Sequence, residues 1–172
     1  MSMVESKMKI RVASERDAAS VDHVLQSSYG SLMKDAYDAA LLERVLPAMT
    51  RANPALLSSG TYYVAMCDTN IVACGGWTAQ RPGTGEVLPK LGHVRHFATH
   101  PSWIRQGFGK AIYSVCECQA VAAGIETFEV LASINALPFY ASIGFDMVSR
   151  MEQPMGDANL PIALMTKRLR AK

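Results

Sequence analysis

The feature that most constrains this chain is the run 94–113, which passes from an extended segment through a glycine-containing turn into an amphipathic helix. Gly107 and Gly109 lie where this helix is predicted to begin. The first N–H groups of a helix have no partner within it, and the helix dipole adds partial positive charge there. The glycines lack the Cβ atoms that would hold an anion away from the backbone, and Arg105 and Lys110 add positive charge. The run therefore predicts a binding site for a phosphate or pyrophosphate.

The spacing of these glycines excludes two well-known phosphate loops. A P-loop needs a Gly five residues before its Gly-Lys pair and a Ser or Thr after it, but Ile104 and Ala111 occupy these positions. A dinucleotide fingerprint needs a third Gly at position 112, which is Ile. A Gly-x-Gly pair at a turn also occurs with no ligand at all, so a second motif has to decide between these interpretations.

The second motif lies downstream and consists of Asn-Ala at 135–136, Phe-Tyr at 139–140 and Gly-Phe at 144–145, after a predicted strand. The two motifs, in this order and at this spacing, resemble those of the GCN5-related N-acetyltransferase (GNAT) family over residues 61–169. One position departs from the family pattern, because Ile104 stands where Gln or Arg is usual. This departure affects a side-chain contact to phosphate from position 104, but not a cradle of backbone N–H groups.

Hydrophobic periodicity predicts seven strands and four helices. The resemblance implies an α/β (α+β) GNAT fold: one mixed, mostly antiparallel, twisted sheet flanked by helices, with a V-shaped splay between its central strands. Residues 1–172 are expected to form a single domain. The predicted strands are 8–13, 61–67, 71–80, 90–99, 126–132, 145–151 and 161–169. The predicted helices begin after Ser14 with an interruption at 29–31, and then cover 37–52, 108–123 and 136–143, the last capped by Asn135.

Composition and charge exclude several classes of partner. Seventeen basic against fifteen acidic residues leave a net charge of +2, which does not favour nucleic acid. No apolar run approaches the roughly 18 residues that cross a bilayer, and the first ten residues lack the apolar core of a secretory leader. The four cysteines contain no Cys-x-x-Cys pair, which favours reduced thiols. We therefore expect a cytoplasmic protein with no nucleic-acid or membrane partner.

The resemblance implies acetyl-coenzyme A as cosubstrate, bound between the strands predicted at 90–99 and 126–132. In the family, a bulge on the first of these strands presents backbone groups to the pantetheine and the thioester. We expect no metal, because histidines three residues apart on a strand point to opposite faces and cannot share a ligand set. The residues expected to bind the coenzyme are Phe97, Ala98, Thr99, Arg105, Gln106, Gly107, Phe108, Gly109, Lys110, Ala111, Asn135 and Phe139.

Tyr140 occupies the position of a tyrosine that many family members use as general acid. A phenol with a pKa of about 10 is protonated at neutral pH and can protonate a thiolate, whose conjugate acid has a pKa of about 8.5. The alternative is that Tyr140 only packs against the pantetheine. For the general base, His93 is preferred because it aligns with the glutamate base of histone-type members; His96, Glu86 and water remain alternatives.

The resemblance implies transfer of an acetyl group to a primary amine of a small molecule or peptide, by direct attack without a covalent intermediate. The alternative is a non-catalytic module of the same fold that binds or senses acyl-coenzyme A. Segments 29–49 and 81–90 are expected to shape the acceptor site, and a homodimer is possible. The aromatic candidates for lining the site are Tyr29, Tyr37, Trp77 and Trp103.

Overall fold

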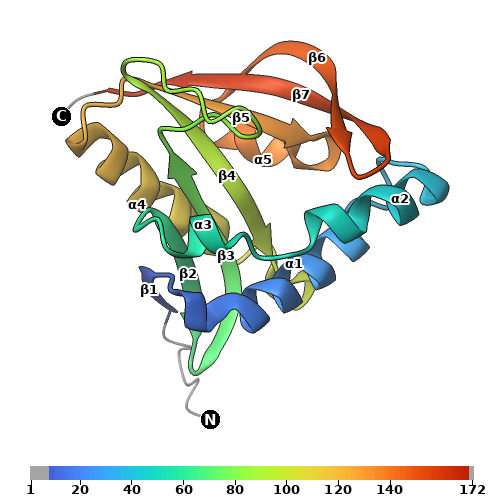
Figure 1. Cartoon of the computed structure of the whole chain (residues 1–172). Helices are drawn as coiled ribbons and strands as arrows, with labels where there is room; N and C mark the ends of the chain where they lie inside the picture. The colour runs from blue at the N-terminus through green and yellow to red at the C-terminus, as the bar shows by residue number, and fades with distance from the viewer. Residues whose placement is uncertain (1–7, 171–172) are drawn as a thin grey trace.

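The computed structural model describes residues 8–170, which form one seven-stranded sheet (Figure 1). The strand order is β1-β2-β3-β4-β5-β7-β6, and the β4–β5 pair is parallel while the other described pairs are antiparallel. The predicted mixed, mostly antiparallel sheet is thus confirmed. The strands are β1 Met8–Val12, β2 Tyr62–Cys67, β3 Asn70–Thr78, β4 Leu91–Thr99, β5 Thr127–Ser133, β6 Asp146–Met155 and β7 Ala158–Arg168.

The sheet opens between β4 and β5. These strands pair only where Leu91–His93 face Thr127–Glu129, whereas β5 pairs with β7 along its whole length. α4 makes the crossover that joins the two parallel strands, as such a connection requires. The predicted V-shaped splay is therefore present, and it leaves the second half of β4 without a neighbour on one side.

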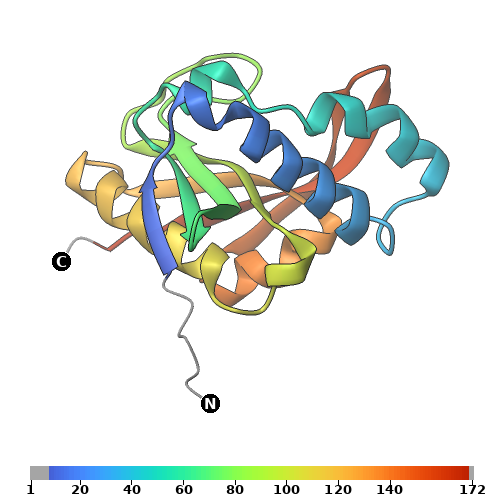
Figure 2. The same ribbon diagram turned by 90° about the horizontal axis from the view of Figure 1, so that it is seen from below.

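Helices cover both faces of the sheet, as Figure 2 shows: α1 and α2 lie on one side, and α4 and α5 on the other. The largest hydrophobic cluster lies under α4 and α5, and two further clusters lie under α1–α3. The α-helices are α1 Ala18–Leu32, α2 Ala39–Met49, α3 Pro54–Leu57, α4 Phe108–Ala122 and α5 Leu137–Ser142. Short 3₁₀ turns occupy Glu15–Asp17, Pro101–Trp103 and Ile134–Ala136.

α1 continues to Leu32, so the predicted interruption at 29–31 is wrong. A glycine inside a helix costs about 1 kcal/mol, which tertiary packing readily outweighs. The Tyr29 side chain packs against the hydrophobic core and donates a hydrogen bond to the Phe97 carbonyl. Met33, just beyond the end of the helix, is fully buried. The helix therefore passes through Gly30 because its buried side extends beyond that residue.

α2 is shorter than predicted, because it starts after Asp38 rather than at Tyr37. The Asp38 carboxylate accepts the backbone N–H of Ala40 as an N-cap. Tyr37 is buried instead, and its hydroxyl donates to the Pro161 carbonyl at 2.6 Å. Between the predicted helix 37–52 and the predicted strand 61–67, the structure also has the short helix α3. The Asn53 side chain caps it by accepting the Ala55 N–H.

The last two strands are longer than predicted and form a tight hairpin around Gly156, which has φ 62°. β6 is an edge strand with mostly exposed residues, so it lacks the hydrophobic alternation from which its length could be predicted. Pro154 is compatible with this edge position. The first seven residues, on which part of the leader prediction rests, lie outside the described chain. Within residues 8–170, no helix is long and apolar enough to cross a membrane.

Candidate active site

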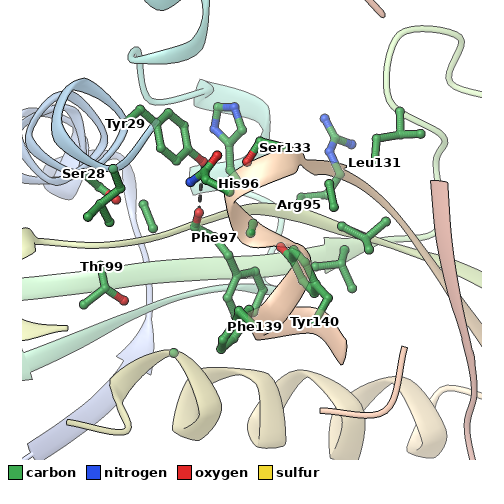
Figure 3. A pocket seen from close by; sticks show the side chains of 18 of the residues that line it. Ser28, Tyr29, Arg95, His96, Phe97, Thr99, Leu131, Ser133, Phe139 and Tyr140 are labelled. Carbon is green, nitrogen blue, oxygen red and sulfur yellow. Dashed lines mark hydrogen bonds between the residues drawn. The ribbon is translucent and has the colours of Figure 1, made fainter. Parts of the chain in front are cut away.

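A cavity of about 640 Å³ opens at the splay between β4 and β5. Its floor is the second half of β4, and the start of α4 and the end of β5 form two of its walls. α1, α5 and the β6–β7 hairpin complete the enclosure. Figure 3 shows side chains from these elements converging on the same space.

A β-bulge lies at the centre of the β4 floor. The register with β3 shifts between Cys74 and Gly76, so that Gly75 is opposite both His96 and Phe97. His96 adopts φ 49°, which is unusual for a residue with a side chain. A Cβ atom on Gly75 would lie 2.6 Å from the Phe97 ring, so this glycine makes room for that ring. The expected bulge on this strand is therefore present.

Two tyrosines, one half-buried and one buried, bond to the backbone of the bulge. The Tyr29 hydroxyl, from α1, donates to the Phe97 carbonyl at 3.0 Å (Figure 3). The Tyr62 hydroxyl, from β2, donates to the His96 carbonyl at 2.9 Å. Burial raises the pKa of both phenols well above the ordinary value, so both are protonated donors. The bulge is thus held from two sides by hydrogen bonds outside the β ladder.

The loop before α4 has the geometry of an anion site. Arg105 and Gly107 both have left-handed backbones, with φ 62° and φ 86°, and Gly107 is the N-cap residue of α4. The N–H groups of Phe108, Gly109 and Lys110 in the first turn have no partner within the helix. Gly109 has a further role: a Cβ there would lie 3.2 Å from the Phe139 ring, so the glycine also permits close packing against α5.

Most of the residues expected to bind the coenzyme line this one cavity. Gln106 and Ala111 do not line it, although they belong to the same loop and helix. Ile104, the position that departs from the family pattern, lines it as well. The predicted residues that line it are Phe97, Ala98, Thr99, Arg105, Gly107, Phe108, Gly109, Lys110, Asn135 and Phe139.

Tyr140 lies on α5 and faces the cavity (Figure 3). Its ring packs edge-on against Phe139 and Phe145, which fixes its direction. Burial raises the pKa of Tyr140, so its hydroxyl is protonated at neutral pH. Within residues 8–170 this hydroxyl makes no hydrogen bond to another side chain or to the backbone. Tyr140 can therefore donate a proton or a hydrogen bond to a molecule in the cavity.

Asn135 does not cap the short helix as predicted. It lies inside the 3₁₀ turn Ile134–Ala136, and α5 begins after Ala136 without a side-chain cap. Its Oδ1 atom is buried and has no hydrogen-bond partner among the described residues. Because Asn135 lines the cavity, this unpartnered acceptor lies in the cavity wall.

The prediction that His93 and His96 face opposite sides of the sheet is wrong, because the bulge breaks the alternation. His96 contacts the Tyr29 ring on the α1 side, whereas Phe97 packs against Phe139 on the other side. His96 lines the cavity, and burial lowers its pKa to about 4. At neutral pH its imidazole is therefore uncharged.

His93 does not line the cavity. It is only 4% exposed, and its Nδ1 lies 3.7 Å from the carboxylate of Glu129, which also contacts Arg81 at 3.6 Å. Burial lowers the pKa of His93, and the nearby Glu129 partly opposes this effect. Glu86 is likewise outside the cavity and bonds to Arg81.

The cavity is also lined by residues that the sequence did not single out. Of the four aromatic candidates, Tyr29 lines the cavity, whereas Tyr37, Trp77 and Trp103 do not. Arg95 also lines it, and alternation along β4 places Arg95 on the face opposite the buried Val94. In the sequence, only this alternation could have indicated that Arg95 lies on this face of β4. The other unpredicted polar residues of the lining are Ser28, Ser133 and Gln153.

The family is decided by a match to the acetyltransferase (GNAT) domain model, which covers residues 33–169. The chain belongs to the GNAT acetyltransferase family. It is therefore an acyltransferase, which supports the enzyme hypothesis over the non-catalytic one. A comparison with curated proteins found no match.

Solved structures of GNAT proteins share the fold. A GCN5-related N-acetyltransferase from Rhodopseudomonas palustris is 23% identical, with a TM-score of 0.81 over 98% of this chain and 100% of the other. The PaiA N-acetyltransferase of Thermoplasma acidophilum, solved in complex with coenzyme A, is 14% identical, with a TM-score of 0.71 over 94% and 99%. The ribosomal-protein-S18-alanine N-acetyltransferase of Escherichia coli is 14% identical, with a TM-score of 0.65 over 96% of each chain.

Proposed function

We propose that this acyltransferase acts as a single domain that moves the acetyl group of acetyl-coenzyme A to a primary amine of a small molecule. The observation that carries the proposal is the convergence, on one cavity, of the first turn of α4, the unpartnered Asn135 acceptor and the Tyr140 hydroxyl. The coenzyme A complex of the Thermoplasma acidophilum protein, which has the same fold, supports this choice of cosubstrate.

The residues present fit coenzyme A. The N–H groups at the start of α4, with Arg105 and Lys110 beside them, suit its pyrophosphate. The Asn135 Oδ1 suits an amide N–H of the pantetheine. The backbone of the bulge at His96–Phe97 and of the following Ala98–Thr99 lines the same cavity as these groups and Tyr140, and we place the thioester beside it.

The proposed reaction is a direct displacement. The amine nitrogen attacks the thioester carbon, a C–N bond forms, and the C–S bond breaks. A backbone N–H of the bulge stabilises the negative charge on the carbonyl oxygen, an effect worth about 3 kcal/mol in comparable sites. Tyr140 donates a proton to the leaving thiolate. His96, which lines the cavity as a neutral imidazole, or water takes the proton of the amine; His93 does not reach the cavity directly.

Tyr140→Phe is the variant that tests this mechanism. We expect its affinity for coenzyme A to stay within about twofold of the unmodified chain, because only a hydroxyl is removed, while turnover falls by about 10²-fold or more. Calorimetry measures the first quantity, and thiol release with a panel of primary amines measures the second. Unchanged turnover in Tyr140→Phe would remove Tyr140 from the mechanism. If the unmodified chain failed to bind coenzyme A, the proposed function would be refuted.

A further inference from the structure

Arg95 is a cation in the lining of the cavity without a carboxylate partner among residues 8–170. It projects from β4 two residues before Phe97, on the same side of the sheet as His96 (Figure 3). A guanidinium offers five N–H donors, and one of them bonds the Thr78 Oγ1 at 3.0 Å. Its remaining donors have no carboxylate within the described chain, although the side chain is half-buried.

Thr78 fixes the direction of this guanidinium. The Thr78 hydroxyl gives its own proton to the Gln80 carbonyl at 2.7 Å, so its lone pairs face Arg95. Glu129, a carboxylate on the neighbouring strand β5, contacts Arg81 and His93 rather than Arg95. The protein thus holds a half-buried cation in place and leaves it without a counter-charge, an arrangement that favours an anionic ligand.

Much of the lining of this cavity is apolar. Side chains from α1, α2, β5 and the β6–β7 hairpin contribute to it. They are Leu32, Met49, Leu131, Met155, Leu160 and Ile162. An acceptor that fits this lining has an apolar body, an amine directed at the bulge, and an anionic group directed at Arg95.

We infer that the acceptor is an amine that also carries a carboxylate, namely an amino acid with an apolar body, and that Arg95 binds this carboxylate. The inference rests on the proposed acetyl transfer and adds the substrate class. Its carboxylate and apolar body distinguish this class from simple alkyl amines and from polyamines.

Matched acceptors test this inference directly. Leucine, leucinamide and isoamylamine share one apolar body, and only leucine carries a carboxylate. The pair 6-aminohexanoate and hexylamine makes the same comparison with a longer spacing between amine and carboxylate. We expect the unmodified chain to show kcat/KM at least about tenfold higher for the carboxylate member of one of these sets. Thiol release measures the rates, and thermal unfolding with coenzyme A present measures whether leucine or 6-aminohexanoate binds.

Variants at Arg95 separate binding from a structural role. In Arg95→Gln the preference for the carboxylate should disappear, mainly through a higher KM for the carboxylate acceptor, whereas kcat/KM for the neutral amines should fall much less. Arg95→Lys should restore part of the preference. If Arg95→Gln does not fold, Thr78→Val, which removes the bond that orients the guanidinium, should reduce the preference instead.

The outcomes that overturn the inference differ from those that overturn the function. Equal rates for neutral and carboxylate acceptors, or an equal loss on both in Arg95→Gln, would refute the role of Arg95 and leave acetyl transfer intact. No thiol release with any amine would refute the proposed function itself. In that case, thermal stabilisation by leucine or 6-aminohexanoate that is lost in Arg95→Gln would still support the carboxylate site.

Discussion

Single hydroxyl groups control the geometry of the β4 bulge. His96 holds a left-handed backbone that costs about 1–2 kcal/mol for a residue with a side chain, so other contacts must stabilise it. The Tyr62 hydroxyl supplies one of them through the His96 carbonyl, and Tyr62 itself does not line the cavity. We therefore expect Tyr62 to act as a positioning residue, in contrast to Tyr140, which lines the cavity.

Replacing Tyr62 with Phe should loosen the bulge without touching a bound molecule. We expect the free energy of unfolding to fall by about 1–2 kcal/mol, because the His96 carbonyl keeps only the weak contact of the Cys74 thiol at 3.9 Å. Turnover should fall several-fold, about 3–10, while the dissociation constant for coenzyme A changes little. Denaturant unfolding and steady-state kinetics measure these effects.

Tyr113→Phe is the matched control for this prediction. Tyr113 is also buried, bonds the Glu117 carboxylate at 3.4 Å, and does not line the cavity. Removing the Tyr113 hydroxyl should leave turnover unchanged. Equal kinetic effects in the two variants would show that the bulge tolerates the loss of Tyr62.

At the scale of elements, the sequence predicted what depends on local residue type and missed what depends on packing between distant segments. Gly107 marks the start of α4 because the left-handed turn favours glycine, and this can be read locally. The β4 bulge changes which side His96 faces, and it depends on Gly75 of another strand and on Tyr29 and Tyr62. No periodicity within β4 contains that information.

The two ends of α4 provide a matched test of the anion site. Gly107 before the helix and Gly124 after it have φ 86° and 88°, and a Cβ at either would meet nothing within 4 Å. Alanine at either position should therefore cost about 1 kcal/mol of stability through backbone strain alone. Gly107→Ala should also weaken coenzyme A binding by about tenfold, since the added methyl group stands where the backbone meets the phosphates.

Calorimetry with coenzyme A and denaturant unfolding separate these two effects. Gly124→Ala should bind coenzyme A like the unmodified chain. If both variants keep full affinity, the start of α4 does not hold the pyrophosphate. If both lose it equally, the effect is one of stability rather than of contact.

At the scale of the whole molecule, the first strand pairs with β2 and also carries an ion pair with two short hydrogen bonds. Arg11 of β1 bonds both carboxylate oxygens of Asp17 at 2.8 Å, and the Ser14 N–H bonds the same carboxylate. The Asp17 side chain is 8% exposed and that of Arg11 is 37% exposed. The hydrogen bonds from Arg11 lower the pKa of Asp17, and burial partly opposes this shift. Because β1 pairs only with β2, this contact fixes the edge of the sheet beside α1.

The lowered pKa of Asp17 predicts a pH dependence of stability. A carboxyl group whose pKa is lower in the folded state stabilises the fold above its unfolded pKa, about 3.9, and loses this effect as pH falls through the folded value. Asp17→Asn should therefore lower the free energy of unfolding by about 1–2 kcal/mol at pH 7, and the difference from the unmodified chain should shrink below about pH 4. Asp157→Asn is the control, because its pair with Arg44 is exposed on both sides and should contribute less than about 0.5 kcal/mol. Urea unfolding from pH 7 to pH 3 measures both variants. A difference for Asp17→Asn that stays constant over this range would mean that the charge of Asp17 does not stabilise the β1 edge.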